Sequence, residues 1–232
     1  MEELFPNREE AGRELARAVM ALQPDDPVVI ALPRGGVPVA AEVARALHAP
    51  LDLLLVRKIG APMQPELAVA AVADGELVID HETCVATGAS REYVESKAAF
   101  ERQEIERRRA AYLRGRAPLP VQGRTAVVVD DGIATGTTVR AALRALRRRG
   151  PARLVLAVPV APADAVHALR GEVDDLVCLR QPAYFHAVGV HYADFHQVSD
   201  DEVVAALHAA ARPDPTAARA PRSPAPGSAG TR

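Results

Sequence analysis

The chain has 232 residues, of which 49% are hydrophobic, and its formal net charge at pH 7 is −2. This length suits one α/β domain with a substantial core, and the near-neutral charge argues against a protein that binds nucleic acid through a basic surface. No apolar stretch reaches the roughly 20 residues of a membrane span, and the opening Met1-Glu2-Glu3 is acidic where a secretory leader is basic, so we expect a cytoplasmic protein without a membrane partner.

Short apolar, β-branched runs alternate with helical patterns along most of the chain. This alternation predicts βαβ units in an α/β fold, with a mostly parallel sheet flanked by helices. Each run is continuous rather than alternating, as expected for strands that are covered on both faces. The strands are predicted at Val28–Ala31, Leu51–Val56, Thr125–Val129, Leu154–Val158 and Leu176–Leu179.

Capping and termination signals predict helices around these strands. Asn7 with Glu10, and Ser199 with Glu202, resemble capping boxes, in which a side chain at each position satisfies a backbone N–H group of the other. A proline in the first helical turn and a glycine just after the last turn mark other helix ends. The predicted helices begin near Asn7, Pro38, Thr137 and Ser199 and end near Leu22, Leu47, Arg149 and Ala211.

The alternation of strands and helices is interrupted between the second and third predicted strands. Two short apolar stretches flank Asp74-Gly75, which predicts a hairpin over Leu67–Asp80. Ser90–Arg114 contains no glycine or proline and is rich in Glu and Arg, which predicts one long helix. Its apolar stripe is thin, so we expect an arm that projects from the body, as part of a lid or arm insertion at about 60–118.

The last part of the chain has a different composition. Residues 212–232 are rich in Pro, Ala, Gly and Ser and have no apolar periodicity, which predicts a disordered tail because such a segment buries too little surface to offset its ordering entropy. The predicted folded domain therefore covers residues 1–211.

The stretch from Val128 to Thr138 carries the functional prediction. It runs from a strand through the acidic pair Asp130-Asp131 and a glycine-bracketed loop into the start of a helix. Such a loop aims backbone N–H donors and the positive end of a helix dipole at one point, which suits a phosphate group. The acidic pair then accepts hydrogen bonds from ribose hydroxyls or holds magnesium, directly or through water. The predicted phosphate-binding residues are Gly132, Ile133, Ala134, Thr135, Gly136, Thr137 and Thr138.

Other interpretations of these motifs are less favoured. A plain surface turn does not need an acidic pair followed by a run of threonines and glycines. The loop lacks the lysine of a Walker motif, and the chain has no G-x-S-x-G elbow of an α/β-hydrolase. His186, His191 and His196 recur every fifth residue, but that spacing alternates faces in an extended segment, so a zinc site is disfavoured.

Val127–Thr138 resembles the signature of type I phosphoribosyltransferases, in which apolar residues and two acids precede a glycine- and threonine-rich phosphate loop. Within that superfamily the chain resembles bacterial phosphoribosyltransferases of unassigned substrate, from the first helix to about Ala211. The resemblance implies an enzyme of nucleotide metabolism, in purine or pyrimidine salvage. It would use magnesium and transfer the 5-phosphoribosyl group of phosphoribosyl pyrophosphate to a nitrogenous base, with release of pyrophosphate.

The resemblance also implies roles for residues outside the phosphate loop. Arg34, Gly35 and Gly36 match a loop that binds pyrophosphate through backbone amides, and glycines allow the close approach of an anion; the alternative is a plain turn into a helix. Arg57-Lys58 match a second pyrophosphate-contacting position, and the alternative is a solvated strand end. The implied catalytic residues are Asp130, Asp131, Arg57 and Lys58.

In the family, the segment after the last core strand forms a small hood over the base, which corresponds here to about 180–197. Tyr184, Phe185 and Tyr192 are candidates for contacts to a planar base or for packing within the hood. The rival hypothesis is a regulator that binds phosphoribosyl pyrophosphate or a nucleotide on the same fold without transferase activity. A DNA-binding regulator should carry a basic face, so no nucleic-acid partner is expected. The acceptor base stays open, and so does a homodimer.

Overall fold

The computed structural model describes residues 3–73 and 75–210. Its centre is a five-stranded sheet in the order β2-β1-β6-β7-β8, and every pairing in it is parallel. The strands are β1 (Pro27–Ala31), β2 (Leu51–Leu53), β6 (Thr125–Val129), β7 (Arg153–Val160) and β8 (Asp175–Arg180). The predicted α/β fold with a mostly parallel sheet is therefore confirmed.

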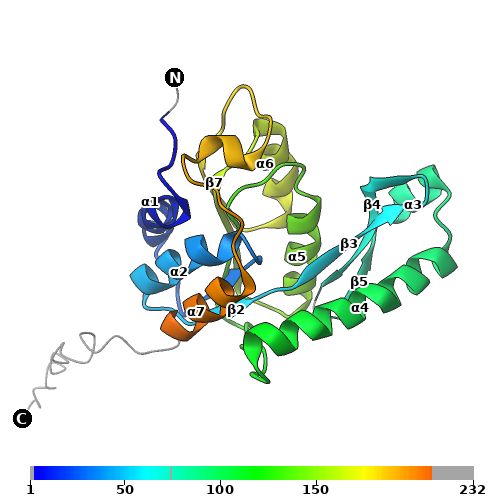
Figure 1. The fold of residues 1–232 in the computed structure, drawn as a ribbon, viewed down its shortest axis with the longest axis horizontal. Helices are drawn as coiled ribbons and strands as arrows, with labels where there is room; N and C mark the ends of the chain where they lie inside the picture. Colours follow the sequence, from blue (N-terminus) through cyan, green and yellow to red (C-terminus); the bar gives the residue numbers. More distant parts are fainter. Residues whose placement is uncertain (1–2, 74, 211–232) are drawn as a thin grey trace, which may run out of the picture.

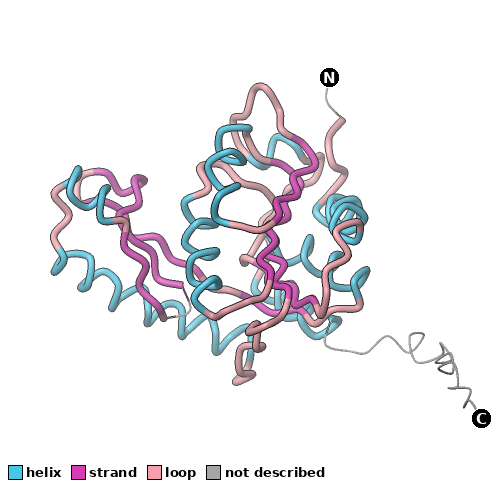
Figure 2. The backbone as a smooth tube through the Cα atoms, turned by 180° about the vertical axis from the view of Figure 1, so that it is seen from behind, coloured by secondary structure: helices cyan, strands magenta, loops and turns pink. Residues whose placement is uncertain are grey.

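Helices cover both faces of this sheet (Figures 1 and 2). Alternate strand residues point to opposite faces, so Val29 and Val127 pack in a cluster with α1, α2 and α7, while Val28 and Val128 pack in a cluster with α5 and α6. The helices are α1 (Arg8–Met20), α2 (Gly36–Leu47), α5 (Thr137–Arg148), α6 (Ala163–Leu169) and α7 (Asp200–Ala210). Two-sided burial explains why the strand sequences are continuously apolar.

The capping signals are confirmed at both ends of the chain. Asn7 Oδ1 accepts a hydrogen bond from the Glu10 N–H group at 2.8 Å, at the start of α1. At α7, the Ser199 N–H group donates to Glu202 Oε2 at 2.7 Å and Ser199 Oγ accepts from the Glu202 N–H group at 3.2 Å. The bonds at α7 are the reciprocal pair of a capping box, whereas α1 has only the Asn7 half, because the Glu10 carboxylate accepts from Arg13 instead.

The predicted strand Leu51–Val56 is wrong in its extent. β2 ends at Leu53, and the chain then enters β3, the first strand of a separate three-stranded antiparallel sheet. Arg57 and Lys58 therefore lie within β3 and not at the end of a core strand. A continuous apolar run gives no periodic signal for a change of partner strand, which is why sequence reasoning joined the two elements. The antiparallel sheet contains β3 (Val56–Ala61), β4 (Gln64–Ala73) and β5 (Glu76–Ile79).

The predicted hairpin and long helix are both present. β4 pairs antiparallel with β5, with Ala73 opposite Glu76, while Asp74 of the predicted turn lies outside the described residues. The long helix is α4, which follows α3 and begins after Ser90, whose Oγ accepts from the Tyr93 N–H group at 3.1 Å. The bounds are α3 (His81–Thr87) and α4 (Arg91–Leu113).

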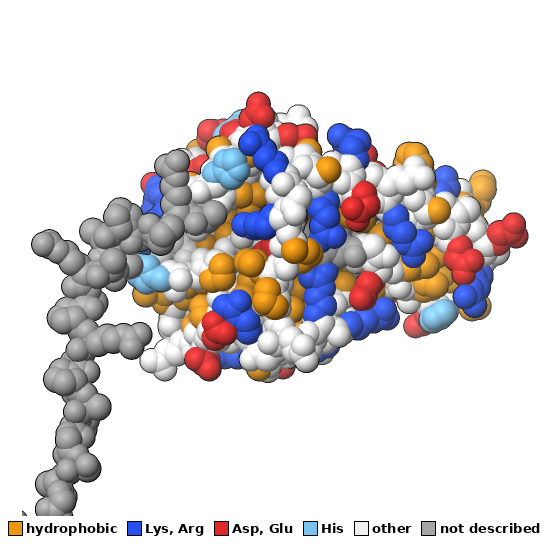
Figure 3. Space-filling model, turned by 90° about the horizontal axis from the view of Figure 1, so that it is seen from below, with side chains coloured by type: hydrophobic (Ala, Val, Ile, Leu, Met, Phe, Trp, Pro, Cys, Tyr) orange, Lys and Arg blue, Asp and Glu red, His pale blue; other side chains and the backbone are white. Residues whose placement is uncertain are grey.

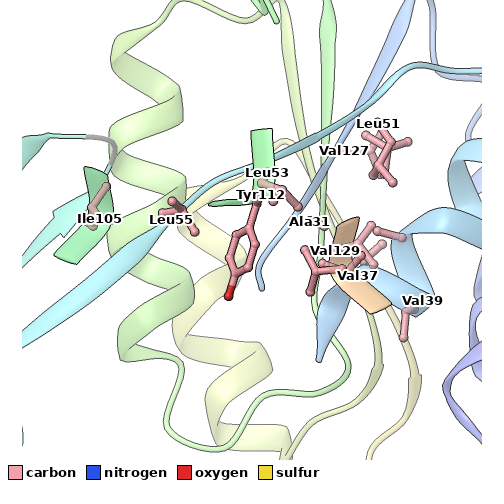
Figure 4. Packing of buried hydrophobic residues seen from close by; sticks show 14 of the residues in the cluster. Ala31, Val37, Val39, Leu51, Leu53, Leu55, Ile105, Tyr112, Val127 and Val129 are labelled. Carbon is pink, nitrogen blue, oxygen red and sulfur yellow. The ribbon is translucent and has the colours of Figure 1, made fainter. Parts of the chain in front are cut away.

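The antiparallel sheet and α4 extend from the body as an arm but share its core (Figure 1). Ile105 and Tyr112 of α4 are 0% and 3% exposed and belong to the same cluster as Leu53 and Val129 of the main sheet. Figure 4 shows this cluster running from Ile105 through Leu55 and Tyr112 to Val129 and Val37. The division into domain, insertion and hood stays a prediction, and residues 212–232 lie outside the described part.

The segment after β8 packs against the start of the chain. It contains the short helix η2 (Val188–His191), and the Phe5 N–H group donates to the His191 carbonyl at 2.9 Å. Phe5 and Tyr192 are buried together in a third small cluster. The remaining short helix is η1 (Arg170–Glu172).

Two surface features bear on the expected partners. No helix within residues 3–73 and 75–210 is both long enough and apolar enough to cross a membrane. On the face shown in Figure 3, lysine and arginine side chains are interspersed with aspartate and glutamate.

Candidate functional site

Two loops meet at the carboxyl edge of the parallel sheet, where β1 and β6 lie side by side. The loop after β1 contains a cis peptide bond between Pro33 and Arg34 and leads into α2. A Cβ atom built on Gly35 would lie 2.0 Å from Asp131 Oδ2, and one on Gly36 would lie 2.8 Å from the Val129 carbonyl oxygen. Only glycine allows this approach, so the two glycines bring the loop into direct contact with the acidic loop.

The backbone amides of the first loop are not equivalent. The Gly36 N–H group donates to the Leu32 carbonyl at 3.1 Å, whereas no hydrogen bond within the described chain uses the N–H groups of Arg34 or Gly35. Two of the three predicted pyrophosphate-binding residues therefore offer a backbone donor, and Gly36 contributes close packing.

The second loop places a row of amides at the start of α5. Gly136 adopts φ +76° as the N-cap of this helix, a conformation that favours glycine. Among residues 3–73 and 75–210, no hydrogen bond uses the backbone N–H groups of the row that ends at Val139, and Arg140 is the first to donate, to the Gly136 carbonyl at 2.8 Å. These donors and the helix dipole together suit an anion. The row consists of Ala134, Thr135, Gly136, Thr137, Thr138 and Val139.

Two residues predicted for this loop, Gly132 and Ile133, make packing and backbone contacts that hold it in place. The Ile133 N–H group donates to the Val160 carbonyl at 2.9 Å, and the side chain is 2% exposed, so Ile133 anchors the loop to the core. A Cβ atom on Gly132 would lie 2.5 Å from Val188 Cγ1. Gly132 thus allows the hood segment to pack on the acidic loop.

Asp130 and Asp131 form a desolvated acidic pair. The Asp131 N–H group donates to Asp130 Oδ1 at 2.9 Å. Burial raises the pKa of Asp130 well above its usual range, and the negative charge of Asp131 adds to the effect. Burial also raises the pKa of Asp131, although the guanidinium of Arg8 opposes the rise through its Nε, 2.8 Å from Asp131 Oδ2. Two acids with one cation make a site that favours a further cation or hydroxyl donors.

The donor set can be tested against a magnesium ion. No group of three or more His, Cys, Asp or Glu side chains suited to a metal occurs among the residues that the structure describes. Magnesium is commonly held by one or two carboxylates and completed by water and substrate phosphates. Asp130 and Asp131 at one edge of the sheet fit that mode of binding.

Arg34 and Arg57, two of the predicted cations, form ion pairs with carboxylates. Arg34 Nη1 lies 3.4 Å from Asp200 Oδ1, which also accepts a hydrogen bond from the Tyr112 hydroxyl at 2.7 Å. Arg57 Nε lies 2.7 Å from Glu101 Oε2 on α4, and Lys58 is exposed beside it on β3. Arg34 thus links the first loop to α7, while Arg57 links the antiparallel sheet to the arm helix.

The hood aromatics differ in exposure. Tyr184 is 86% exposed, and the Phe185 ring stacks on His191 with centroids 5.4 Å apart. Tyr192 is 5% exposed, and its hydroxyl donates to the Asp131 carbonyl at 2.5 Å. Its ring lies against two neighbouring aromatic rings, those of Phe5 and Phe195. The ring of Tyr192 therefore packs within the hood, which is the alternative to a base contact that the sequence left open for this residue.

Sequence reasoning missed Arg8 and Asp200. Arg8 is the first residue of α1 and the ion-pair partner of Asp131, although 123 positions separate them in the chain. One signal existed, since a cation in the first turn opposes the helix dipole. The contact of Asp200 with Arg34 had no signal because acids in a first turn are ordinary.

Comparison with known proteins gives consistent similarities. A family model described as phosphoribosyl transferase domain matches residues 2–194. The chain is 49% identical, over 213 residues, to provisionally named phosphoribosyl transferases of two Mycobacterium tuberculosis strains, with 90% of this chain and 47% of each relative covered. It therefore spans about half the length of the curated relatives it matches. It is also similar to the crystal structure of the protein TT1426 from Thermus thermophilus, with a TM-score of 0.81 and 45% identity over 88% of this chain and 97% of that one.

Proposed function

This chain belongs to the family of phosphoribosyl transferase domains, and on that premise we propose that it transfers a 5-phosphoribosyl group from phosphoribosyl pyrophosphate to a nitrogenous base. The observation that carries the proposal is the row of unpaired amides from Ala134 to Val139 beside Asp130 and Asp131. Every helix start leaves its first N–H groups without a partner, but here the row begins before the helix, at Ala134 and Thr135, and follows closely on two desolvated acids.

Each part of the substrate has a matching set of groups. The amides of Ala134–Thr138 and the positive end of α5 suit the 5-phosphate. Asp130 and Asp131 suit the ribose hydroxyls, because carboxylates accept hydrogen bonds from vicinal alcohols. The N–H groups of Arg34 and Gly35 suit the pyrophosphate, since no acceptor within the described residues uses them and their loop packs on the acidic loop.

The reaction forms a bond from a base nitrogen to C1 of the ribose and breaks the bond from C1 to the pyrophosphate oxygen. Pyrophosphate leaves with the electron pair, and the base loses its proton to solvent. A ring with oxocarbenium character develops positive charge, which Asp130 and Asp131 stabilise while the two loops hold both ends of the substrate in place. Asp130 and Asp131 would hold magnesium when it is bound, and the ion would neutralise charge on the leaving group.

One observation favours the rival function, a regulator that binds phosphoribosyl pyrophosphate or a nucleotide without turnover. Arg34 is paired with Asp200 and Arg57 with Glu101, so these two of the cations proposed for the leaving group already have carboxylate partners. A transferase must exchange these partners for pyrophosphate, whereas a protein that binds a nucleotide without pyrophosphate need not.

The test is pyrophosphate release by the purified full chain with phosphoribosyl pyrophosphate, magnesium and a panel of purine and pyrimidine bases. Asp130→Asn should lower the rate by on the order of 100-fold or more, because a preorganised charge in the site is lost. The matched control is Asp175→Asn, which removes a carboxylate paired with Arg153 at 2.7 Å at the start of β8. Binding of phosphoribosyl pyrophosphate without turnover on any base would favour the regulator, and absence of binding would exclude both functions.

The cellular location, the metabolic role, the base contacts and the oligomeric state are part of the same proposal. We place the reaction in the cytoplasm, in purine or pyrimidine salvage, and support the location by the two free thiols of Cys84 and Cys178. Tyr184 and Phe185 stay candidates for base contacts, and a homodimer stays open. Cell fractionation and sedimentation of the purified protein test the location and the dimer.

A further inference from the structure

Arg8 connects three parts of the chain at the acidic pair. Its Nε donates to Asp131 Oδ2 at 2.8 Å, and its Nη1 donates to the His196 carbonyl at 2.8 Å. The guanidinium carbon also lies 3.8 Å from the centroid of the Phe195 ring. Helix α1, the acidic loop and the hood segment therefore meet on one side chain.

The position of Arg8 is unfavourable for a cation by itself. The residue is only 6% exposed, and removing a charge from water has a large cost unless a partner and hydrogen bonds compensate. It also occupies the first position of α1, where the helix dipole favours negative charge. Both costs are offset at this point by Asp131, so the ion pair is what accounts for an arginine here.

The ion pair also fixes Asp131. Its side chain is held at Oδ2 by Arg8, and its backbone carbonyl is held by the Tyr192 hydroxyl at 2.5 Å. Gly35 leaves space for the same oxygen, because a Cβ atom there would lie 2.0 Å from Oδ2. The Arg8 contact uses Oδ2 and not Oδ1 of this carboxylate.

We infer that Arg8 is a positioning residue, which holds the Asp131 carboxylate in the orientation that accepts a hydrogen bond from a ribose hydroxyl of the bound sugar phosphate. The inference rests on the proposed function, because it assigns Asp131 to the ribose. Arg8 itself does not touch the substrate in this scheme. Its removal should weaken recognition of the sugar and spare recognition of the anions.

Arg180 supplies a matched control at the same junction. Its guanidinium carbon lies 3.5 Å from the centroid of the Phe5 ring, and the side chain donates to the Glu3 carbonyl. It therefore joins the end of β8 to the start of the chain through an aromatic ring, a carbonyl and an ion pair with Glu14 at 3.6 Å, the same kinds of contact that Arg8 makes. No contact within the described residues joins Arg180 to Asp131.

The experiment measures binding of three probes by calorimetry: ribose 5-phosphate, inorganic phosphate and pyrophosphate. Arg8→Met should weaken binding of ribose 5-phosphate by on the order of tenfold, the effect of losing a hydrogen bond to a charged group, and leave binding of both inorganic anions unchanged. Arg8→Lys, which keeps the charge but not the planar fork of donors, should show the same selectivity with a smaller loss. Arg180→Met should bind all three probes like the wild type.

The outcomes distinguish a failure of the positioning role of Arg8 from a failure of the proposed function. Equal weakening of all three probes in Arg8→Lys would show a general structural role and overturn the inference, as would unchanged binding of ribose 5-phosphate. Arg8→Lys carries this decision if Arg8→Met does not fold. A wild-type protein that binds neither ribose 5-phosphate nor inorganic phosphate would overturn the proposed function instead.

Discussion

Replacement of Gly35 by alanine tests whether the two loops of the site must touch. A Cβ atom at this position would lie 2.0 Å from Asp131 Oδ2 and 2.6 Å from its Cγ. The Asp131 side chain cannot rotate away freely, since Arg8 Nε holds Oδ2 at 2.8 Å and the two side chains are only 7% and 13% exposed. The methyl group must therefore either separate the loops or break a largely buried ion pair.

The expected loss of unfolding free energy follows from overpacking at the contact between the two loops. Forcing extra atoms into a packed contact typically costs about 1–3 kcal/mol of unfolding free energy. In a domain of this size about 1 kcal/mol corresponds to roughly 2–4 °C in Tm, so Gly35→Ala should lower Tm by about 2–12 °C. Pyrophosphate binding should weaken as well, because the N–H group of residue 35 moves with the loop.

Calorimetric unfolding and pyrophosphate titration measure the two effects. Gly171→Ala is the control, because a Cβ atom on Gly171 meets nothing within 4 Å, and a surface change of this kind stays within about 0.5 kcal/mol. In an Asp131→Ala background, which removes the overlapping carboxylate, Gly35→Ala should cost at least about 1 kcal/mol less. Equal stability and pyrophosphate affinity of the Gly35→Ala and Gly171→Ala proteins would refute the reasoning.

Three further predictions concern charged groups. Asp52→Ala should destabilise the fold in urea unfolding by about 1–3 kcal/mol per unpaired donor, since Asp52 is 2% exposed and accepts from Arg116; a change below about 0.5 kcal/mol would contradict this. The Glu202 carboxylate raises the pKa of His196 above 6.5, so this ion pair stabilises the fold below pH 6.5, and its contribution is lost as pH rises through the pKa of the folded protein. His196→Gln should therefore lower Tm more at pH 5.5 than at pH 8.5, and an equal loss of Tm at both pH values would refute this prediction. Asp200→Asn should tighten pyrophosphate binding about two- to fivefold by releasing Arg34, and calorimetry showing weaker binding would argue against competition.

Local sequence patterns determined the central sheet, the long arm helix and the glycine-bracketed loop between β6 and α5. A strand buried on both faces needs a continuous apolar run, and Thr125–Val129 shows one. Charged residues and glycines flank this run on both sides, so it is too short to be a helix. The loop that follows carries glycine at position 136, where the backbone adopts φ +76°. Because these requirements act within a few residues, the sequence displays them directly.

Only the tertiary structure decided which distant side chains complete the site. Arg8 meets Asp131 across 123 positions, and Arg34 meets Asp200 across 166. The break of the run Leu51–Val56 into two sheets was equally invisible, because both halves are apolar and buried. Side-chain pairs of this kind depend on how helices and loops are stacked around the sheet, and no local periodicity encodes that stacking.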